Sequence, residues 1–284
     1  MATTIDETLS NAVQQAEDVC ALPLVRRLGA TLDMDPARWR MGDPLPRGWH
    51  LAFFTVDTRQ SQLRADGVAG FGVALPDLGL PRIVFGGRRI SFPGDIPIGA
   101  HMRRHSRLIS VVPKTGRSGR FALATIQHEI FAGKAAAPAV VDRQDLILRE
   151  AIATAEPGKP DQSVAGGPAM PEPSLRSVVL PDETLLFRIS AIMFNSHRIH
   201  FDRPYAVEQE GYPALVVNGS VSSLLLLEFF RAQAQREPVS IHLRNLGLAF
   251  CGRPLRLNAV PGERSWRLWA DDENGNLVVE GWME

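Results

Sequence analysis

The sequence has 284 residues, of which 45% are hydrophobic and 22% are charged, with 31 Lys and Arg against 31 Asp and Glu. This composition is ordinary for a globular protein and excludes collagen-like and strongly disordered chains. Its two cysteines, Cys20 and Cys251, are too few for a disulfide framework or a cysteine-rich zinc site. The length allows one large domain or two smaller ones, and either arrangement buries an adequate core.

The apolar segments and the first residues argue against a membrane or exported protein. No apolar run reaches the roughly 18 to 20 residues that a transmembrane helix needs. Residues 1–20 contain acidic residues but no Lys or Arg, which fits neither a signal peptide nor a transit peptide. We therefore expect a protein of the reducing cytoplasm that has no membrane contact.

The zero net charge conceals a basic segment. Residues 82–120 contain nine Lys and Arg but a single acid, Asp95, so their net charge is about +8. Such a segment can bind the phosphates of a ligand, or it can be the solvated surface of strands. The charge pattern alone leaves both alternatives open.

The first half of the chain predicts helices followed by strands. Helical residues 7–28 precede a second candidate helix at residues 46–56, which is rich in Trp and Phe. Strand-like runs follow at residues 82–92, 101–112, 120–131 and 140–149.

The middle of the chain predicts a linker. Residues 157–173 hold five Pro and three Gly with almost no apolar periodicity. We interpret them as the boundary between an N-terminal domain, residues 1–156, and a C-terminal domain, residues 174–284. Both parts have the size of an ordinary domain.

The second half repeats the order of the first. A strand predicted at residues 184–193 leads to a histidine-rich segment, and residues 220–235 then predict a buried helix with Ser near its N-cap. β-like runs follow at residues 239–250, 254–260, 265–270 and 276–282. A helix followed by antiparallel strands predicts an α+β fold in each half, duplicated at an offset of about 175 residues.

Two histidines, His197 and His200, lie three residues apart directly after a predicted strand. An imidazole can take up or release a proton near neutral pH, and a nearby carboxylate such as Asp202 can orient it. A zinc site would need a third ligand, and no further His or Cys is close in the sequence. The remaining alternative is that both histidines only cap the strand through hydrogen bonds to the backbone.

Other chemical motifs are absent from the sequence. There is no Gly-x-Ser-x-Gly nucleophile motif, and neither Cys stands in a catalytic signature. Neither a Walker spacing nor a dinucleotide-binding glycine fingerprint is present, so we expect no cofactor and no metal. Few aromatic residues accompany the basic segment, so we do not expect nucleic-acid binding.

The chain resembles the MaoC-like hydratases in two segments of its second half, residues 194–206 (FNSHRIHFDRPYA) and residues 210–219 (EGYPALVVNG). Within that superfamily it is similar to type 2 hydroxyacyl-thioester dehydratases and to mesaconyl-C4-CoA (3-methylfumaryl-CoA) and itaconyl-CoA hydratases. Residues 42–50, 85–92 and 117–129 of the first half agree. The resemblance implies a double hotdog, two hotdog folds in one chain, each a long helix wrapped by an antiparallel sheet.

The resemblance also implies catalytic roles for His200 and Gly219. His200 matches the catalytic histidine of the wider family's Asp-x-Asn-Pro-x-His motif. Gly219 matches the glycine whose backbone N–H binds the thioester oxygen. A helix N-terminus suits that role, because its N–H groups and dipole stabilise developing enolate charge.

The match departs from the wider family at two positions of this motif. Asn195 stands where the wider family has its catalytic Asp, and His197 stands where the motif has Asn. We expect His200 to be the base, Asp202 to orient it, and Asn195 or His197 to hold the water. Asn218 stands where the closer subgroup often has His.

The implied activity is the reversible syn hydration of a C5 dicarboxylic acyl-CoA, mesaconyl-C4-CoA or itaconyl-CoA, to citramalyl-CoA. Arg198 and Arg203 are candidates for binding the free carboxylate of the acyl group. The remaining candidate substrate-binding residues are Asn218 and, for the phosphates of coenzyme A, Arg88 and Arg89 of the basic segment.

Three alternatives remain open. One is a 3-hydroxyacyl-thioester dehydratase of fatty-acid metabolism, acting on CoA or acyl-carrier-protein thioesters. The others are a non-catalytic acyl-CoA-binding module, suggested by Asn195, and a thioesterase on the same fold. A double hotdog can pair its sheet within one chain yet often dimerises, so a homodimer also stays open.

Overall fold

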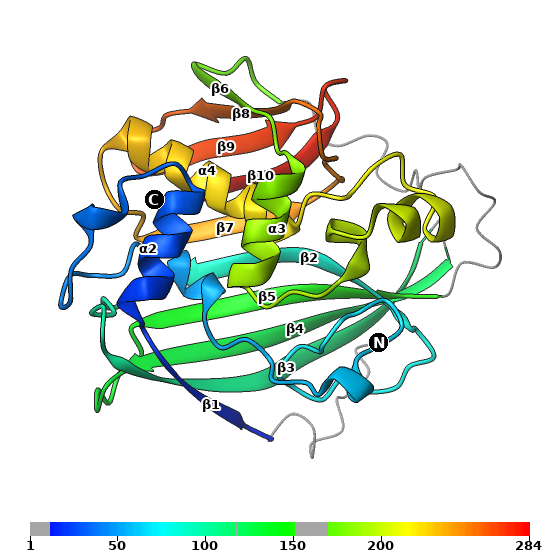
Figure 1. Cartoon of the computed structure of the whole chain (residues 1–284), viewed down its shortest axis with the longest axis horizontal. Helices are drawn as coiled ribbons and strands as arrows, with labels where there is room; N and C mark the ends of the chain where they lie inside the picture. The colour runs from blue at the N-terminus through cyan, green and yellow to red at the C-terminus, as the bar shows by residue number, and fades with distance from the viewer. Residues whose placement is uncertain (1–11, 117–118, 151–169) are drawn as a thin grey trace.

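The computed structural model describes residues 12–116, 119–150 and 170–284. Within these residues, one antiparallel sheet runs through both halves in the order β1-β3-β4-β5-β2-β7-β10-β9-β8-β6 (Figure 1). The first half contributes β1 (Gln14–Val19), β2 (Arg82–Ser91), β3 (His101–Gly116), β4 (Gly119–Ala132) and β5 (Val140–Arg149). The second half contributes β6 (Leu175–Val179), β7 (Ser240–Asn245), β8 (Leu255–Val260), β9 (Trp266–Asp271) and β10 (Leu277–Met283).

Helices cover one face of this sheet (Figure 1). They are α2 (Leu22–Thr31), α3 (Glu183–Ile192) and α4 (Gly219–Ala234). The short helical turns are η1 (Pro36–Arg38), η2 (Trp49–Ala52), η3 (Gln60–Gln62), η4 (Arg198–His200) and the π-helical η5 (Tyr205–Gln209). We call the helix-covered face the inner face.

The sheet repeats itself around its centre. Read outward from the β2–β7 pair, the first half has the order β2-β5-β4-β3-β1 and the second half β7-β10-β9-β8-β6. Each outermost strand is followed by a short helix, α2 after β1 and α3 after β6, and these two helices pack together. The predicted duplication is confirmed, although β2 and β7 begin 158 residues apart rather than about 175.

The core of the second half is built on α4. Asn218 begins the helix, because its side-chain Oδ1 accepts a hydrogen bond from the Ser220 N–H at 2.8 Å. Leu224, Leu227 and Phe230 are fully buried, and the helix packs against β8, β9 and β10. The helix predicted at residues 220–235 is therefore confirmed.

The first half has no equivalent of α4 among its described residues. Residues 46–56, predicted to be helical, form only η2, because left-handed residues at Gly48 (φ +95°) and Phe54 (φ +57°) bound that turn. The expected long helix of the first half is therefore wrong. In its place, apolar side chains from residues 71–80 pack on the inner face of β3, β4 and β5.

Two further segments differ from the prediction. Residues 184–193, predicted as a strand, lie in α3, because Asp182 Oδ1 accepts a hydrogen bond from the Leu185 N–H at 2.7 Å and caps the helix. Leu186 and Ile189 then bury one face of that helix. The segment 7–28, predicted to be helical, contains β1 as well as α2 in its described part.

Most of the predicted linker, residues 157–173, lies outside the described residues, which resume at residue 170. The domain boundary therefore stays a prediction. Among the helices that the structure describes, none has the length and apolar character needed to cross a membrane.

The two halves are joined by the pairing of β2 with β7. Gly87 pairs with Arg244, and Ile90 with Ile241. Gly87 follows a bulge in β2 and has φ +152°, and a Cβ there would lie 2.3 Å from the Leu243 carbonyl oxygen. Glycine is therefore required for the two strands to approach each other. We call this pairing the seam.

Replacing Gly87 with Ala should lower the free energy of unfolding by about 2 kcal/mol or more, because the methyl group would separate β2 from β7. Gly70→Ala is the matched control, since Gly70 also has a positive φ (+136°) but a Cβ there would meet no atom within 4 Å. Urea unfolding followed by circular dichroism measures both variants. Equal losses would show that backbone conformation alone, and not strand contact, requires glycine at position 87.

Candidate active site

The histidine segment begins with a turn after α3. Phe194 is left-handed (φ +49°), and the Asn195 N–H donates to the Ser190 carbonyl at 2.8 Å. The Asn195 Oδ1 then accepts a hydrogen bond from the His197 N–H at 3.0 Å. This Asx turn leads the chain directly into η4, which carries His200.

His200 is buried, with only 7% of its surface exposed, and its Nδ1 lies 2.8 Å from the Val216 carbonyl oxygen. A carbonyl can only accept a hydrogen bond, so Nδ1 carries the proton and Nε2 keeps its lone pair. Burial, together with the neighbouring His197, lowers the pKa of His200 to about 4. The imidazole is therefore neutral at pH 7 and has a free basic nitrogen.

The same backbone contact connects His200 to the start of α4. The Val216 N–H donates to the Ile199 carbonyl at 3.0 Å, and the helix begins three residues later at Gly219. The Asn218 Oδ1 accepts a hydrogen bond from the Ser220 N–H. The Gly219 N–H, in contrast, makes no backbone hydrogen bond with the residues that the structure describes. A helix N-terminus with a free N–H favours negative charge on a bound atom.

Gly219 also lies at the seam between the two halves. A Cβ at this position would be 3.4 Å from Phe85 Cδ1, on β2, and 3.6 Å from Asn245 Nδ2, on β7. The Asn245 amide in turn donates to the Phe85 carbonyl at 3.3 Å. Both halves therefore contribute to the surroundings of this N–H group.

A first-half loop covers the histidine segment. The Ser196 hydroxyl donates to the Gly67 carbonyl at 2.6 Å, and the Arg198 N–H donates to the Asp66 carbonyl at 2.9 Å. A Cβ on Gly67 would lie 2.0 Å from the Ser196 carbonyl oxygen, so the close approach needs glycine. The sequence interpretation missed this contact, and the Asp66-Gly67 pair, a common turn signal, is the feature that could have indicated it.

His197 stands beside His200. The two rings are nearly perpendicular, with centroids 5.3 Å apart. Burial lowers the pKa of His197, against the opposing influence of Asp66 and Glu210. Since protonation of either ring disfavours protonation of the other, the pair holds at most one added proton near neutral pH.

Asp202 does not orient His200, contrary to our prediction. Its Oδ2 accepts hydrogen bonds from Arg198 Nε and Nη2, at 2.9 and 2.8 Å. Its Oδ1 accepts a hydrogen bond from the Tyr205 N–H at 3.1 Å. The hydrogen bond from Arg198 lowers the pKa of Asp202. The Val216 carbonyl holds the position that we assigned to this carboxylate. Arg203 is exposed.

Four of the nine basic residues of the basic segment form ion pairs with acids that the structure describes. Arg88 and Arg89 point to opposite faces of β2, so the structure does not bring them together as one phosphate site. Arg88 is bonded to buried Asp142, and Arg89 donates to Asp145 at 3.0 Å. Arg107 likewise pairs with Glu129, and Arg120 with Glu150.

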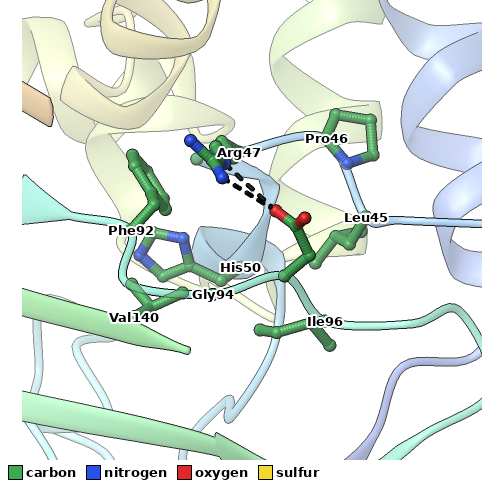
Figure 2. Close-up of a pocket in the computed structure, with 10 residues that line it drawn as sticks. Leu45, Pro46, Arg47, His50, Phe92, Gly94, Ile96 and Val140 are labelled. Carbon is green, nitrogen blue, oxygen red and sulfur yellow. Dashed lines mark hydrogen bonds and ion pairs between the residues drawn. The ribbon is translucent and has the colours of Figure 1, made fainter. Parts of the chain in front are cut away.

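A small pocket lies between the segments formed by residues 45–50 and 92–96 of the first half (Figure 2). His50, Phe92 and Val140 line it, and the Arg47–Asp95 ion pair lies at its edge. Its volume of about 10 Å³ is enough for one water molecule and far too small for an acyl-CoA. Among the described residues, no group of three His, Cys, Asp or Glu side chains is placed to hold a metal ion.

Comparison with known proteins identifies the family. Residues 48–251 match the sequence profile described as hydroxyacyl-thioester dehydratase type 2. The chain is also 34% identical to Mesaconyl-C(4)-CoA hydratase of Chloroflexus aurantiacus over 272 residues, which is 95% of this chain and 94% of that protein. The chain belongs to the type 2 hydroxyacyl-thioester dehydratase family.

Solved structures confirm the fold of this dehydratase-family chain. A MaoC-like dehydratase from Phytophthora capsici superposes with a TM-score of 0.71 at 12% identity, covering 99% of this chain and 98% of that one. A Mycobacterium tuberculosis protein described as a double hotdog gives a TM-score of 0.57 at 12% identity, covering 96% and 94%. The predicted double hotdog is therefore confirmed, with α4 as its long helix among the described residues.

The buried histidines of this dehydratase-family chain should make its stability depend on pH. Unfolded His200 takes up a proton near pH 6.5, whereas the folded imidazole does so only near pH 4. The unfolded state therefore binds the extra proton in this window, and the free energy of unfolding falls as the pH falls, by about 1.4 kcal/mol per pH unit for one proton.

His200→Asn, whose amide can still donate to Val216 but cannot titrate, should lower this pH dependence by one proton. His128, whose pKa is likewise about 4 because it is buried, contributes equally to both proteins and cancels in the comparison. Urea unfolding at a series of pH values between 4 and 6.5 measures the difference. Parallel curves for the two proteins would contradict the neutral, buried state assigned to His200.

Proposed function

We propose that the chain is a hydro-lyase that adds water reversibly to a C5 dicarboxylic acyl-CoA, mesaconyl-C4-CoA or itaconyl-CoA, and forms citramalyl-CoA. One observation carries the proposal: neutral His200 is hydrogen bonded to Val216, three residues before the free N–H of Gly219 at the N-terminus of α4. The relative named Mesaconyl-C(4)-CoA hydratase, which aligns with 95% of the chain, supports the acyl group.

The proton transfers of mesaconyl-C4-CoA hydration can all pass through His200. Nε2 removes a proton from water while the water oxygen bonds to the β-carbon, and the alkene electrons move onto the thioester oxygen as an enolate. The imidazolium then gives a proton to the α-carbon, and the enolate electrons return to form the C–H bond. The product contains one added water, and His200 is neutral again.

The surroundings of His200 and of the Gly219 N–H favour this order of proton transfers. The Gly219 N–H and the dipole of α4 stabilise the negative enolate oxygen. Burial lowers the pKa of His200 to about 4, so the imidazolium passes its proton on readily. In this proposal His197, whose ring is nearly perpendicular to that of His200, holds the attacking water. Asn195 acts by shaping the turn before η4.

The family match over residues 48–251 favours a second candidate, a 3-hydroxyacyl-thioester dehydratase. This enzyme would run the same chemistry in the direction of water loss on a straight acyl chain. The two functions differ in the acyl group that the site accepts, so a set of substrates separates them.

The purified chain should hydrate mesaconyl-C4-CoA or itaconyl-CoA with a higher kcat/KM than crotonyl-CoA or longer enoyl-CoAs. The loss of enoyl-thioester absorbance measures the conjugated substrates, and chromatography of citramalyl-CoA measures itaconyl-CoA, whose alkene is not conjugated with the thioester. His200→Asn should lower kcat by roughly 10²- to 10⁴-fold, because the amide that replaces the imidazole cannot take up the proton. The exposed His101, replaced by Asn, serves as the control and should keep wild-type activity.

Other outcomes of this assay identify the alternatives. Turnover restricted to straight-chain substrates would establish the dehydratase, and release of free CoA would establish a thioesterase. Tight binding without turnover would show an acyl-CoA-binding module. Near wild-type rates with His200→Asn would remove His200 from the mechanism.

Gly219→Ala should lower kcat/KM by roughly 10- to 100-fold without loss of stability. The added methyl group meets the protein only at ordinary contact distances of 3.4 Å or more, and Ala favours a helix over Gly. It would nevertheless crowd a thioester oxygen approaching the N–H, and small displacements of reacting groups are costly. Kinetics combined with thermal unfolding tests this, and unchanged kcat/KM in a folded variant would exclude the Gly219 N–H as the oxyanion donor.

A further inference from the structure

A buried group of charged and polar side chains lies on the inner face of the first half. In strand order it contains Arg104 on β3, His128 on β4, Asp142 on β5 and Arg88 on β2. Asp142, only 2% exposed, is bonded to Arg88, and its Oδ2 lies 3.4 Å from Nε2 of His50. We call these five side chains the inner-face cluster.

The arginines of the inner-face cluster outnumber its acid. The Arg88 guanidinium holds the pKa of Asp142 well below its usual range even though burial opposes this. Burial also lowers the pKa of His128 to about 4, so this ring is neutral at pH 7. One carboxylate thus faces two guanidinium groups. A buried cation without a partner is unfavourable unless an anion neutralises it.

Arg104 is the cation whose hydrogen bonding is incomplete. Its Nη1 donates to the Phe54 carbonyl at 3.1 Å, but its buried Nε has no hydrogen-bond partner. Asp142 Oδ1 and His50 Nδ1 are two further buried atoms without one. Asp18, the other acid close to Arg104, is partly exposed and accepts the Phe54 N–H at 2.7 Å. Buried polar atoms are normally paired, so the Arg104 Nε–H donor indicates a ligand with an acceptor atom, whereas Asp142 Oδ1, which can only accept a hydrogen bond, gives no such indication.

The inner-face cluster lies next to the proposed oxyanion donor. Phe85 Cδ1 is 3.4 Å from the Cβ position of Gly219, and the Arg88 guanidinium lies 4.9 Å from the centroid of the same ring. Because both contacts are made to one aromatic ring, the Arg88 guanidinium carbon lies at most about 11 Å from the Gly219 Cα.

One loop covers both the histidine segment and the inner-face cluster. Gly67 of this loop contacts Ser196 in the histidine segment, and Gly72, five residues later, lies over Arg104, because a Cβ there would be 3.0 Å from Nη2. The loop therefore runs from the histidine segment to the inner-face cluster. At the side of the inner-face cluster away from this loop, the cluster ends at its own member His50, whose ring lies between Phe92 and Val140 (Figure 2).

We propose that the inner-face cluster binds the free carboxylate of the acyl group, with Arg104 and Arg88 as its ion-pair partners. The inference rests on the proposed function for the position of the thioester. In mesaconyl-C4-CoA the carboxylate carbon is roughly 4 Å from the thioester carbonyl carbon. Hydrogen bonds of about 2.9 Å at each end extend this to about 10 Å between donors, which lies within the upper limit on the separation of Gly219 and Arg88.

This assignment replaces the arginines that the sequence suggested for the carboxylate. Arg198 is bonded to Asp202, and Arg203 is exposed. Asp142 is then a positioning residue that holds Arg88 in place. Arg104, which has no ion pair with Asp142 in the structure, supplies the charge that the ligand neutralises.

The test compares two unreactive acyl-CoAs of equal chain length, succinyl-CoA with a free carboxylate and butyryl-CoA without one, by isothermal titration calorimetry. The full-length wild-type chain should bind succinyl-CoA at least 10-fold more tightly. Arg104→Met should remove that preference while leaving butyryl-CoA affinity within about twofold, since the methionine keeps much of the side-chain volume. In turnover, the same variant should raise KM for mesaconyl-C4-CoA more than it lowers kcat.

Arg143→Met is the matched control, because Arg143 adjoins Asp142 on β5, is exposed and faces the opposite side of the sheet. Arg88→Lys keeps the charge beside Asp142 and should weaken succinyl-CoA binding partially. Folding of each variant is checked by thermal unfolding. If Arg104→Met does not fold, the Arg88→Lys result decides, and an unchanged preference there would overturn the carboxylate site.

Each result separates this inference from the proposed function. An unchanged succinyl-CoA preference in folded Arg104→Met, or no preference in the wild type, overturns the carboxylate site. A wild type that prefers succinyl-CoA through Arg104 but hydrates no enoyl-CoA supports the site and contradicts the proposed function.

Discussion

Hydrogen bonding between β2 and β7 is the constraint on which the rest of the structure depends. It makes one continuous sheet from two similar halves, and it brings Phe85 of the first half against Gly219 of the second. Gly87 permits that approach, because any side chain there would meet the Leu243 carbonyl. This pairing holds both halves in register, and the histidine segment, the helix N-terminus and the inner-face cluster are neighbours as a result.

The chemistry proposed for the second half depends on the partner of His200, which is the neutral Val216 carbonyl instead of a charged carboxylate. The Val216 carbonyl fixes the Nδ1–H tautomer of His200 as a carboxylate would, but it adds no negative charge to stabilise the imidazolium. Burial then keeps the pKa of His200 low. The histidine accordingly suits a reaction in which it accepts a proton briefly and returns it to the substrate. Asp202 is left to stabilise the local turn with Arg198 and Tyr205.

Most of the sheet could be predicted from the sequence, because its strands alternate apolar and polar residues and end at Gly or Pro turns. The helix α4 was equally clear from its long apolar stretch. The strand predicted at residues 184–193 was wrong, because a capping residue outside the apolar run, Asp182, decided the outcome. His200 and Gly219 could be found by resemblance, and their geometry agrees with the expected chemistry.

The partners of those residues could not be found in the same way. The orienting role of Asp202 was inferred from closeness in sequence, whereas the acceptor of His200 is a backbone carbonyl sixteen residues away. Arg104 was hidden in a segment, residues 82–120, whose charge was counted as one patch, although neighbouring strand residues face opposite sides of the sheet. An acid at an inward-facing position of β5, Asp142 between Val140 and Leu146, was a signal of a buried polar site.

The missing helix of the first half has a consequence for how such a chain can diverge. In the second half the inner face is occupied by α4, so its residues are constrained by packing as well as by proton transfer. In the first half, the same face is covered by a loop and carries no proton-transfer group of the proposed mechanism. Mutations there can change which acyl group is accepted while the reaction itself is preserved. In the proposed function, selectivity and proton transfer therefore belong to different halves of a single sheet.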